Sequence, residues 1–355
     1  MISQLLTSDF RNLEPLDWWP GRGSHLLLGG NGAGKTSLLE AVYVVATTRS
    51  FRAAQIGDCV RHGSDSFRVH AEVDTDHRSS LEVSWSGGKR ERSLNGKVSP
   101  LSDHLASLPV VAWTSAEAEV LIGAPKARRR FLDRGIVGAR PAALEVLGRY
   151  REALRQKRQL LLQEGSGIEI WNELLASLAA EVIQLRHEYT EKLKGMLVTV
   201  LEESGLPFPP VELRYRPSPA AGLEGAESIA DSLDSIAERE RRRQMPLLGP
   251  HRDELEILWG GHDIRRVASA GERKSLSLLL LAAHGRTLEG MERRPVYLLD
   301  DADAELAPPT HASVWKVFQG DGTRQILASS NRPQVWLTLE VGKIWEMEKG
   351  KLSLL

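Results

Sequence analysis

The pattern of apolar positions predicts α/β structure near both ends of the chain. Residues 2–10 partly alternate between apolar and polar, and residues 25–28 form a compact apolar run that stops at glycine, so both predict short strands. Apolar residues at steps of three and four then predict a helix over residues 35–45. Residues 66–98 alternate again and are interrupted by a Gly-Gly and an Asn-Gly pair, which predicts a small antiparallel sheet.

The middle of the chain is predicted to be a helical hairpin. Residues 144–164 and 169–203 are rich in Leu, Glu, Arg and Gln, and the apolar positions of the second stretch follow steps of three and four. Glycines at 165 and 167 separate them, which favours an antiparallel arrangement. At ~1.5 Å per residue the second helix is roughly 50 Å long, far short of a coiled-coil rod. Residues 217–237 are interpreted as a soft linker, and strand patterns return at residues 255–259, 296–299 and 325–328.

Composition excludes several classes of protein. With 355 residues, 41% hydrophobic and 26% charged, the chain can bury a core and is not globally disordered. The 46 Lys and Arg residues almost balance the 47 Asp and Glu residues, so any nucleic-acid surface must be a local patch. The one cysteine, Cys59, allows no intramolecular disulfide. Asp9 and Arg11 interrupt what would be the apolar centre of a signal peptide, and no apolar run approaches ~20 residues, so we expect a soluble, cytoplasmic protein without membrane contact.

One segment carries a phosphate-binding signature. Residues 29–36 fit the pattern G-x-x-x-x-G-K-[ST] at every fixed position, between a predicted strand and a predicted helix. There, backbone N–H groups can surround phosphate oxygens at the positive end of the helix, Lys35 can neutralise β- and γ-phosphates, and the Thr36 hydroxyl can bind Mg²⁺. The alternative is an ordinary glycine-rich turn. The predicted nucleotide-binding residues are Gly29, Gly30, Asn31, Gly32, Ala33, Gly34, Lys35 and Thr36.

Two aspartates follow a second apolar strand, at residues 296–299. Asp300 is predicted to bind magnesium together with Thr36, and Asp301 to polarise the attacking water as a general base, with Lys35 as the other catalytic residue. A pair of aspartates after a strand is by itself more often a loop start or a helix cap. The functional interpretation therefore depends on their occurrence together with the phosphate loop.

A third element precedes that strand. Ser269, Gly271 and Glu272 open a predicted helix, and a serine and a glycine at a helix start can hold an anion of phosphate size. The same residues also make an ordinary N-terminal cap, so the element is weak evidence alone. The evidence is stronger because of the order of the motifs along the chain: the phosphate loop, a long insertion, this helix start, and then the apolar strand with two aspartates.

That order resembles the ATP-binding-cassette ATPase heads of the SMC, Rad50 and RecF group, and the RecF family most closely. The resemblance spans nearly the whole chain and is carried by residues 9–12, 29–41, 49–52, 123–133, 249–253, 269–272 and 298–301. It implies an α/β fold in which an ABC-type ATPase head is built from both ends of the chain and a helical arm is inserted. The expected parts are residues 1–115 with the phosphate loop, residues 116–205 as the arm, and residues 206–355 with the signature and Walker B motifs.

The resemblance also implies a function. We expect an ATP- and Mg²⁺-dependent DNA-binding protein of recombinational repair, in which Ser269 and Gly271 contact the γ-phosphate of ATP held by a second copy. Such a homodimer would act on single-stranded, gapped or junction DNA with recombination mediator proteins. It would help load the recombinase and support replication restart and SOS induction.

The resemblance implies a weak, DNA-dependent ATPase, and the sequence departs from the family pattern in ways that predict slow hydrolysis. The family usually has Glu-Leu-Asp where this chain has Glu305, Leu306 and Ala307, and residues 328–331 lack the histidine of transporter-type cassettes. Residue 301 is also Asp rather than Glu. Two alternatives stay open, a cassette subunit of a transporter and an ATP-gated scaffold that does not hydrolyse ATP.

Basic patches supply candidate DNA contacts. Residues 126–134 hold five basic residues and one acidic residue, and residues 149–158 have the same balance, so each patch could neutralise several phosphates without reading sequence. Arginines on helices more often form a solvated face or pair within the protein. The candidate contacts are Arg128, Arg129, Arg130, Arg155 and Arg158.

Overall fold

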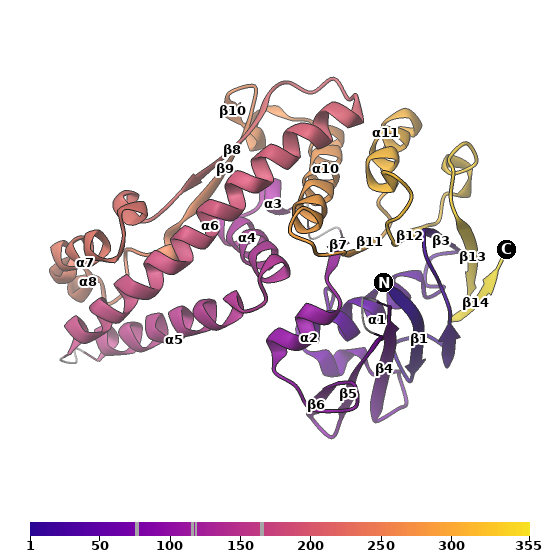
Figure 1. Ribbon diagram of the computed structural model, residues 1–355, viewed down its shortest axis with the longest axis horizontal. Helices are drawn as coiled ribbons and strands as arrows, with labels where there is room; N and C mark the ends of the chain where they lie inside the picture. Colours follow the sequence, from indigo (N-terminus) through magenta and orange to yellow (C-terminus); the bar gives the residue numbers. More distant parts are fainter. Residues whose placement is uncertain (75–77, 115–116, 118, 164–166) are drawn as a thin grey trace. The chain divides into compact units, whose positions relative to one another are not determined.

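The computed structural model describes residues 1–355 except 75–77, 115–116, 118 and 164–166, and it divides into two compact units (Figure 1). Unit 1 comprises Met1–Ala118, Thr199–Pro207 and Ser269–Leu355, and unit 2 comprises Glu119–Val198 and Phe208–Ala268. Unit 1 is therefore assembled from both ends of the chain. None of the helices in the described part of the chain has the length and apolar composition needed to cross a bilayer.

A largely parallel sheet organises unit 1. Its strand order is β14-β13-β3-β12-β11-β7, and all neighbours pair in parallel except β13 and β14. Every residue of β11 and β12 is buried, as expected for central strands covered on both faces. The strands are β3 (Ser24–Leu28), β7 (Val110–Trp113), β11 (Val296–Leu299), β12 (Ile326–Ser330), β13 (Lys343–Glu348) and β14 (Lys351–Leu354).

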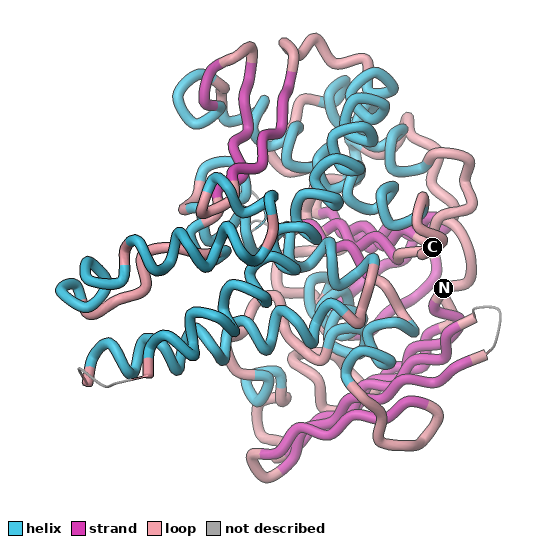
Figure 2. The backbone as a smooth tube through the Cα atoms, turned by 60° about the vertical axis from the view of Figure 1, so that its left-hand side comes forward, coloured by secondary structure: helices cyan, strands magenta, loops and turns pink. Residues whose placement is uncertain are grey.

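An antiparallel sheet, in the order β2-β1-β4-β5-β6, forms the second layer of unit 1 (Figure 2, magenta strands at lower right). The predicted alternation is confirmed, because Phe67, Val69, Leu81 and Val83 are buried. Gly87 and Gly88 make the turn between β5 and β6, whereas the Asn-Gly turn at residues 95–96 leads only to an isolated bridge. The strands are β1 (Ile2–Ser8), β2 (Leu16–Trp18), β4 (Ser66–Val73), β5 (Ser79–Ser86) and β6 (Lys89–Leu94).

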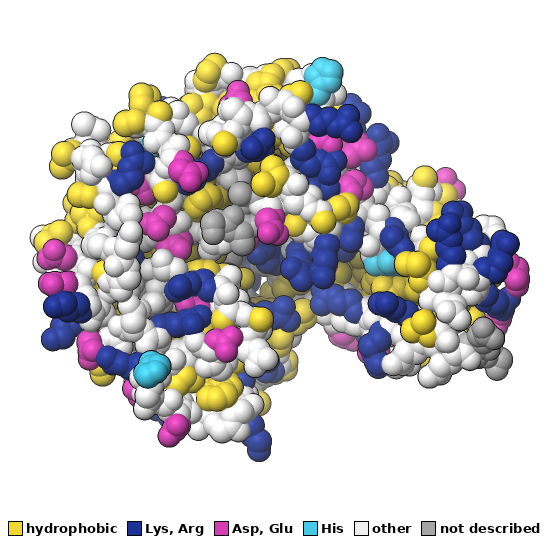
Figure 3. All heavy atoms as spheres, turned by 180° about the vertical axis from the view of Figure 1, so that it is seen from behind, with side chains coloured by type: hydrophobic (Ala, Val, Ile, Leu, Met, Phe, Trp, Pro, Cys, Tyr) yellow, Lys and Arg dark blue, Asp and Glu magenta, His cyan; other side chains and the backbone are white. Residues whose placement is uncertain are grey.

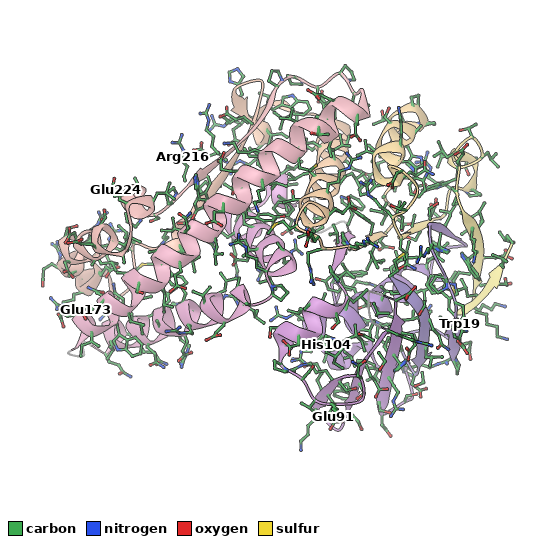
Figure 4. All side chains as sticks on the ribbon, viewed as in Figure 1. Trp19, Glu91, His104, Glu173, Arg216 and Glu224 are labelled. Carbon is green, nitrogen blue, oxygen red and sulfur yellow. The ribbon has the colours of Figure 1, made fainter. Side chains whose placement is uncertain are left out.

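Helix α1 (Lys35–Thr47) lies between the two sheets. Its residues Leu38, Leu39 and Val42 are fully buried in one apolar core with residues of both sheets. Helix α2 (Leu101–Ser107) packs against α1, and His104, labelled in Figure 4, has its Nε2 2.8 Å from the Val45 carbonyl oxygen. The other helices of unit 1 are α10 (Ala270–Glu289) and α11 (Pro308–Gln319), with short 3₁₀ turns η1 (Ile56–Cys59) and η5 (Pro333–Val335).

Unit 2 contains the predicted helical hairpin. The two long helices are confirmed as α5 (Ala143–Leu162) and α6 (Ile168–Ser204), and the last residues of α6 belong to unit 1. Of the residues that separate the predicted helices, 165 and 166 lie outside the described residues. Tyr150 of α5 and Val182 of α6 share an apolar core. The remaining elements are α3 (Glu119–Ile122), α4 (Pro125–Ala139), β8 (Val211–Arg216), η3 (Ala220–Glu224), α7 (Ala226–Ser235), α8 (Ala237–Arg243), η4 (Pro250–Arg252), β9 (Glu254–Trp259), β10 (His262–Asp263) and α9 (Ile264–Val267).

Two features of unit 2 differ from the sequence-based expectation. The linker predicted at residues 217–237 is wrong, because Ile229 and Leu233 of α7 enter the core of the hairpin and fix a helix there. Residues 208–268, expected as part of the head, group instead with the helices. Buried ion pairs explain that grouping, since Arg186 of α6 binds Asp253 at 2.8 Å and Arg128 of α4 binds Glu254 at 2.6 Å.

Candidate functional site

The candidate site lies at the carboxyl edge of the parallel sheet. Strands β3, β12 and β11 are neighbours, so the segments that follow them meet at one edge. Leu28 leads into the predicted phosphate loop, Leu299 leads into the two aspartates, and Ser330 leads into Asn331. All of these residues belong to unit 1.

The loop at residues 29–36 has a backbone that requires glycine at two points. Gly29 has φ of 154°, and a Cβ there would lie 2.2 Å from the Met347 carbonyl oxygen. Gly34, with φ of 118°, is the N-cap of α1 and has no side chain to bond the first N–H groups of that helix. Those N–H groups are consequently suited to an anion at the positive end of α1.

Lys35 supplies a cation inside this loop. Its side chain is only 6% exposed, and its Nζ donates hydrogen bonds to the carbonyl oxygens of Gly29 at 2.8 Å and Gly30 at 2.9 Å. Two carbonyl oxygens hold the ammonium group without neutralising it. The loop therefore combines N–H donors with a full positive charge, as phosphate binding requires.

Thr36, Asp300 and Ser329 come together although the first two lie 264 residues apart. The Thr36 hydroxyl and the Ser329 hydroxyl each donate to Asp300 Oδ1 at 2.8 Å. Within the described residues no group of three or more His, Cys, Asp or Glu side chains could hold a metal. A hydroxyl and a carboxylate oxygen nevertheless fit Mg²⁺, which commonly takes one or two protein ligands and completes its shell with water and phosphate oxygens.

Asp301 has a strained and incompletely bonded position. Its φ is 47°, and its backbone N–H donates to Ser329 Oγ at 2.9 Å, while its buried Oδ1 has no hydrogen-bond partner among the described residues. Burial and the neighbouring Asp300 carboxylate raise the pKa of Asp301, and the Lys35 charge opposes that rise. A carboxylate oxygen left without a partner is costly, so its retention is consistent with a role toward a bound group or water.

Three residues of this edge were missed by the sequence reasoning. Ser329 bonds both aspartates, and the Asn331 amide donates to Asn31 Oδ1 of the loop at 3.0 Å. Asn12 donates to the Gly32 carbonyl oxygen at 2.8 Å and accepts from Ser37 Oγ at 2.7 Å. Asn12 lies in one of the motifs noted in the sequence, but the strand order that brings Ser329 and Asn331 here leaves no local signal.

The motif residues at 11, 50 and 52 surround a buried carboxylate. Glu40 of α1 is fully buried and accepts from Arg11 Nε at 2.9 Å and from Arg11 Nη2 at 2.7 Å. The Ser50 hydroxyl bonds the same carboxylate, and the Arg52 guanidinium lies 3.7 Å from it. These motifs therefore hold α1, and with it the end of the phosphate loop, in place.

Ser269 and Glu272 form a capping box at the start of α10. The Glu272 N–H donates to Ser269 Oγ at 3.3 Å, and the Ser269 N–H donates to the Glu272 carboxylate at 2.7 Å. Ser269 and Gly271 are exposed. The structure thus shows a capped helix start that is open to solvent, and an anion at this position stays a prediction.

Arg128 does not present its guanidinium to solvent, which argues against its predicted contact with DNA. It is 3% exposed, and its Nε donates to Glu254 at 2.7 Å while its Nη1 donates to the Gly123 carbonyl oxygen at 2.9 Å. Lys157, counted in the second basic patch, is also buried and is paired with Glu240. Both basic side chains are therefore buried in ion pairs with glutamates that lie far away in the sequence.

The other candidate arginines differ in their exposure and in whether other residues of the protein bind them. Arg129 is half-buried and donates to the Asp253 carbonyl oxygen at 2.8 Å, and exposed Arg155 is held at two points by Glu152. Arg130 and Arg158 are exposed, and neither has an ion pair within the described ranges. Figure 3 shows Lys and Arg side chains gathered on the lobe at the right of the view, which belongs to unit 2.

Comparisons with known proteins agree over nearly the full length of the chain. The family model described as RecF/RecN/SMC N terminal domain matches residues 1–350. A protein of Geotalea daltonii named DNA replication and repair protein RecF is 31% identical over 360 residues, covering 99% of each chain. The protein of the same name from Myxococcus xanthus is also 31% identical, over 95% of this chain and 94% of its own.

Solved structures give the same picture. A structure described as the recombination mediator protein RecF-ATP in the RecFOR pathway superposes with a TM-score of 0.88 at 25% identity, covering 100% of this chain and 97% of that one. An SmcHead bound to the C-winged helix domain of ScpA has a TM-score of 0.60 at 15% identity, covering 100% and 96%. The second likeness is one of fold alone, and it confirms the predicted α/β ATPase-head architecture.

The buried Glu40 carboxylate leads to a prediction about stability. Glu40→Ala leaves the Arg11 guanidinium without its carboxylate, and we expect the free energy of unfolding to fall by about 3 kcal/mol or more. Urea denaturation followed by circular dichroism measures the decrease. Glu14→Ala is the matched control, because Glu14 pairs with Arg61 at the surface and should change stability little. Equal decreases for the two variants would contradict a stabilising role of the Glu40 cluster.

Proposed function

The chain belongs to the RecF family, and from this premise we propose that it is an ATP-dependent DNA-binding protein of DNA replication and repair. The observation that carries the proposal is the contact of Thr36 with Asp300, which joins the phosphate loop to the acidic pair that follows strand β11. The alternative of an ordinary glycine-rich turn does not account for a buried lysine and an acidic pair at the same edge.

We propose that residues 29–36 bind the phosphates of ATP. The N–H groups at the start of α1 and the Lys35 ammonium would hold the β- and γ-phosphates, and Thr36 and Asp300 would hold Mg²⁺. The metal would neutralise charge on the phosphate oxygens. Asp301 would orient a water molecule and accept its proton at the unpartnered Oδ1. An aspartate has a shorter reach than a glutamate, which is consistent with slow, DNA-stimulated turnover.

A homodimer would complete each site. The sequence contains one phosphate loop and one Ser269 element, and the exposed Ser269 and Gly271 are available to a second copy. In the proposed dimer these residues bind the γ-phosphate of ATP held by the other chain. Loss of that phosphate then weakens the dimer, so hydrolysis acts as a timer.

The proposed role in the cell follows the names of the relatives. One solved relative is described as a recombination mediator protein of the RecFOR pathway. We propose that this chain likewise acts in the cytoplasm with mediator proteins on single-stranded, gapped or junction DNA. There it would help load the recombinase and support replication restart and SOS induction. The exposed Arg130 and Arg158 of unit 2 would contact the phosphate backbone.

Removing the loop cation tests the nucleotide site. Lys35→Ala is expected to abolish ATP-induced dimerisation, because it removes the charge that neutralises the β- and γ-phosphates. Light scattering with and without ATP measures the dimer, and circular dichroism checks the fold. Lys97→Ala, an exposed lysine in a turn, is the control and should dimerise like the wild type. An unchanged ATP-induced dimer in Lys35→Ala would exclude this loop as the nucleotide site.

Removing the proposed general base separates a hydrolysing switch from a passive scaffold. Asp301→Asn is expected to bind ATP normally and to lower DNA-stimulated phosphate release by roughly 100-fold. Phosphate release under single-turnover conditions measures this step. Equal, background-level release by the wild type and Asp301→Asn would leave only the scaffold.

Charge reversal tests the DNA surface. The double variant Arg130→Glu and Arg158→Glu is expected to weaken binding to DNA of any sequence. It should also reduce the slope of log binding constant against log salt concentration by about 1 for each DNA phosphate that it no longer neutralises. Fluorescence anisotropy over a salt series, with ATP present, measures both effects. Arg266→Glu, an exposed arginine of α9, is the control. A salt slope equal to that of the control would mean that Arg130 and Arg158 do not contact DNA.

A further inference from the structure

The segment that follows the two aspartates, residues 302–306, is fixed on one side to the candidate site. Asp303 is 1% exposed and accepts hydrogen bonds from Ser330 Oγ at 2.6 Å and Trp336 Nε1 at 3.3 Å. Its backbone carbonyl accepts from Arg332 Nη1 at 2.8 Å. These donors come from the end of β12 and the residues after it, where Ser329 also bonds both aspartates. Movement of the segment would therefore disturb the edge at which Thr36 and Asp300 meet.

Lys274 holds the other side of the segment. It lies in the second turn of α10, five residues after Ser269, and its Nζ donates to the Ala304 carbonyl oxygen. The same nitrogen lies 4.9 Å from the ring centre of Trp113, at the end of β7. Trp113 Nε1 in turn donates to Ser277 Oγ of α10 at 3.2 Å. The half-buried ammonium is thus enclosed by an aromatic face and a backbone carbonyl.

The charges around the segment favour this contact. Burial lowers the pKa of Lys274, and the carboxylates of Glu305, Asp303 and Asp301 attract its ammonium group and oppose that effect. Ala307, which follows the segment, offers no polar side chain. The Lys274 side chain thus links α10, the helix that begins at Ser269, directly to residues 302–306, which follow Asp300 and Asp301.

We propose that Lys274 is a positioning residue that ties residues 302–306 to the start of α10, and so couples the Ser269 end of a chain to the acids of the same chain. The inference rests on the proposed function, in which Ser269 serves one nucleotide site of a dimer and Asp300 and Asp301 serve the other. Binding of a phosphate at Ser269 then shifts the start of α10. Through its hydrogen bond to the Ala304 carbonyl oxygen, Lys274 passes this displacement on to residues 302–306. The two sites of the dimer hydrolyse ATP in a coupled manner.

Substitution at Lys274 tests the contact and its consequence separately. Lys274→Met keeps an unbranched side chain, one atom shorter, that can still pack on Trp113, but it removes the donor and the charge. In the nucleotide-free protein, we expect the amides of residues 302–306 to exchange hydrogen roughly tenfold faster, because the variant cannot form the charge-assisted hydrogen bond. Lys274→Arg keeps a donor and a cation and is expected to stay within about threefold of the wild type. Lys97→Met is the matched control for the same chemical change at an exposed site.

Steady-state hydrolysis measures the coupling. In Lys274→Met, kcat is expected to fall roughly tenfold while KM for ATP stays within about twofold, since Lys274 acts on the acids and not on the phosphate loop. The dependence of rate on ATP concentration is expected to change from sigmoidal in the wild type to hyperbolic in Lys274→Met. Rescue of both properties by Lys274→Arg supports the proposal.

The possible outcomes separate this inference from the proposed function. Normal amide exchange at residues 302–306 in Lys274→Met would overturn the tie itself. Faster exchange with unchanged kcat and an unchanged ATP dependence would overturn the coupling and leave Lys274 a packing residue. A wild-type protein that fails to bind ATP would overturn the proposed function and the coupling with it, while the exchange data would still decide the tie.

Discussion

Strand β3 lies between two strands from the opposite end of the chain, and the rest of unit 1 depends on that pairing. Residues 24–28 pair in parallel with β12 on one side and β13 on the other. The phosphate loop therefore starts from a strand whose place is set by residues about 300 positions further along the sequence. The chain between β3 and β12, which includes unit 2, must therefore leave this sheet and return to it. The Asp300 carboxylate, bonded by Thr36 and Ser329, is the point at which the three neighbouring strands are joined by side chains.

Local pattern was sufficient for the parts of the site that are continuous in sequence. The phosphate loop, the acidic pair and the capped Ser269 helix each have a short signature, because each is built by one strand end or one helix start. Ser329 and Asn331 have no such signature, since their roles depend on β12 lying between β3 and β11. Arg128 was a candidate DNA contact and Lys157 was counted in a basic patch, because helical spacing cannot show that they pair with Glu254 and Glu240. The helix α7 was hidden by a composition that is typical of linkers.

Buried ion clusters explain several motifs that lie outside the proposed nucleotide site. Glu40 gathers Arg11 and Ser50 around α1, and Arg186 joins Asp133 to Asp253 within unit 2. Breaking such a pair on one side leaves a charge in a low-dielectric interior, so both partners are needed together. These clusters also account for part of the near-zero net charge, because many of the arginines and carboxylates compensate one another inside the protein. The charge left on the surface is smaller than local counts along the sequence suggest.

The central place of β3 also has a consequence for how the protein is made. A ribosome releases the N-terminal strand early, but its two neighbours in the sheet emerge only when residues 326–330 and 343–348 have been synthesised. During that interval the apolar β3 and α1 have incomplete partners, whereas the helices of unit 2 lie close together in sequence and can pack first. The nascent chain would therefore present an unfinished sheet for most of its synthesis, and this is the stage at which it most needs protection by chaperones. A premature stop just before β13 would remove a neighbour of β3 and leave the nucleotide loop attached to an open strand.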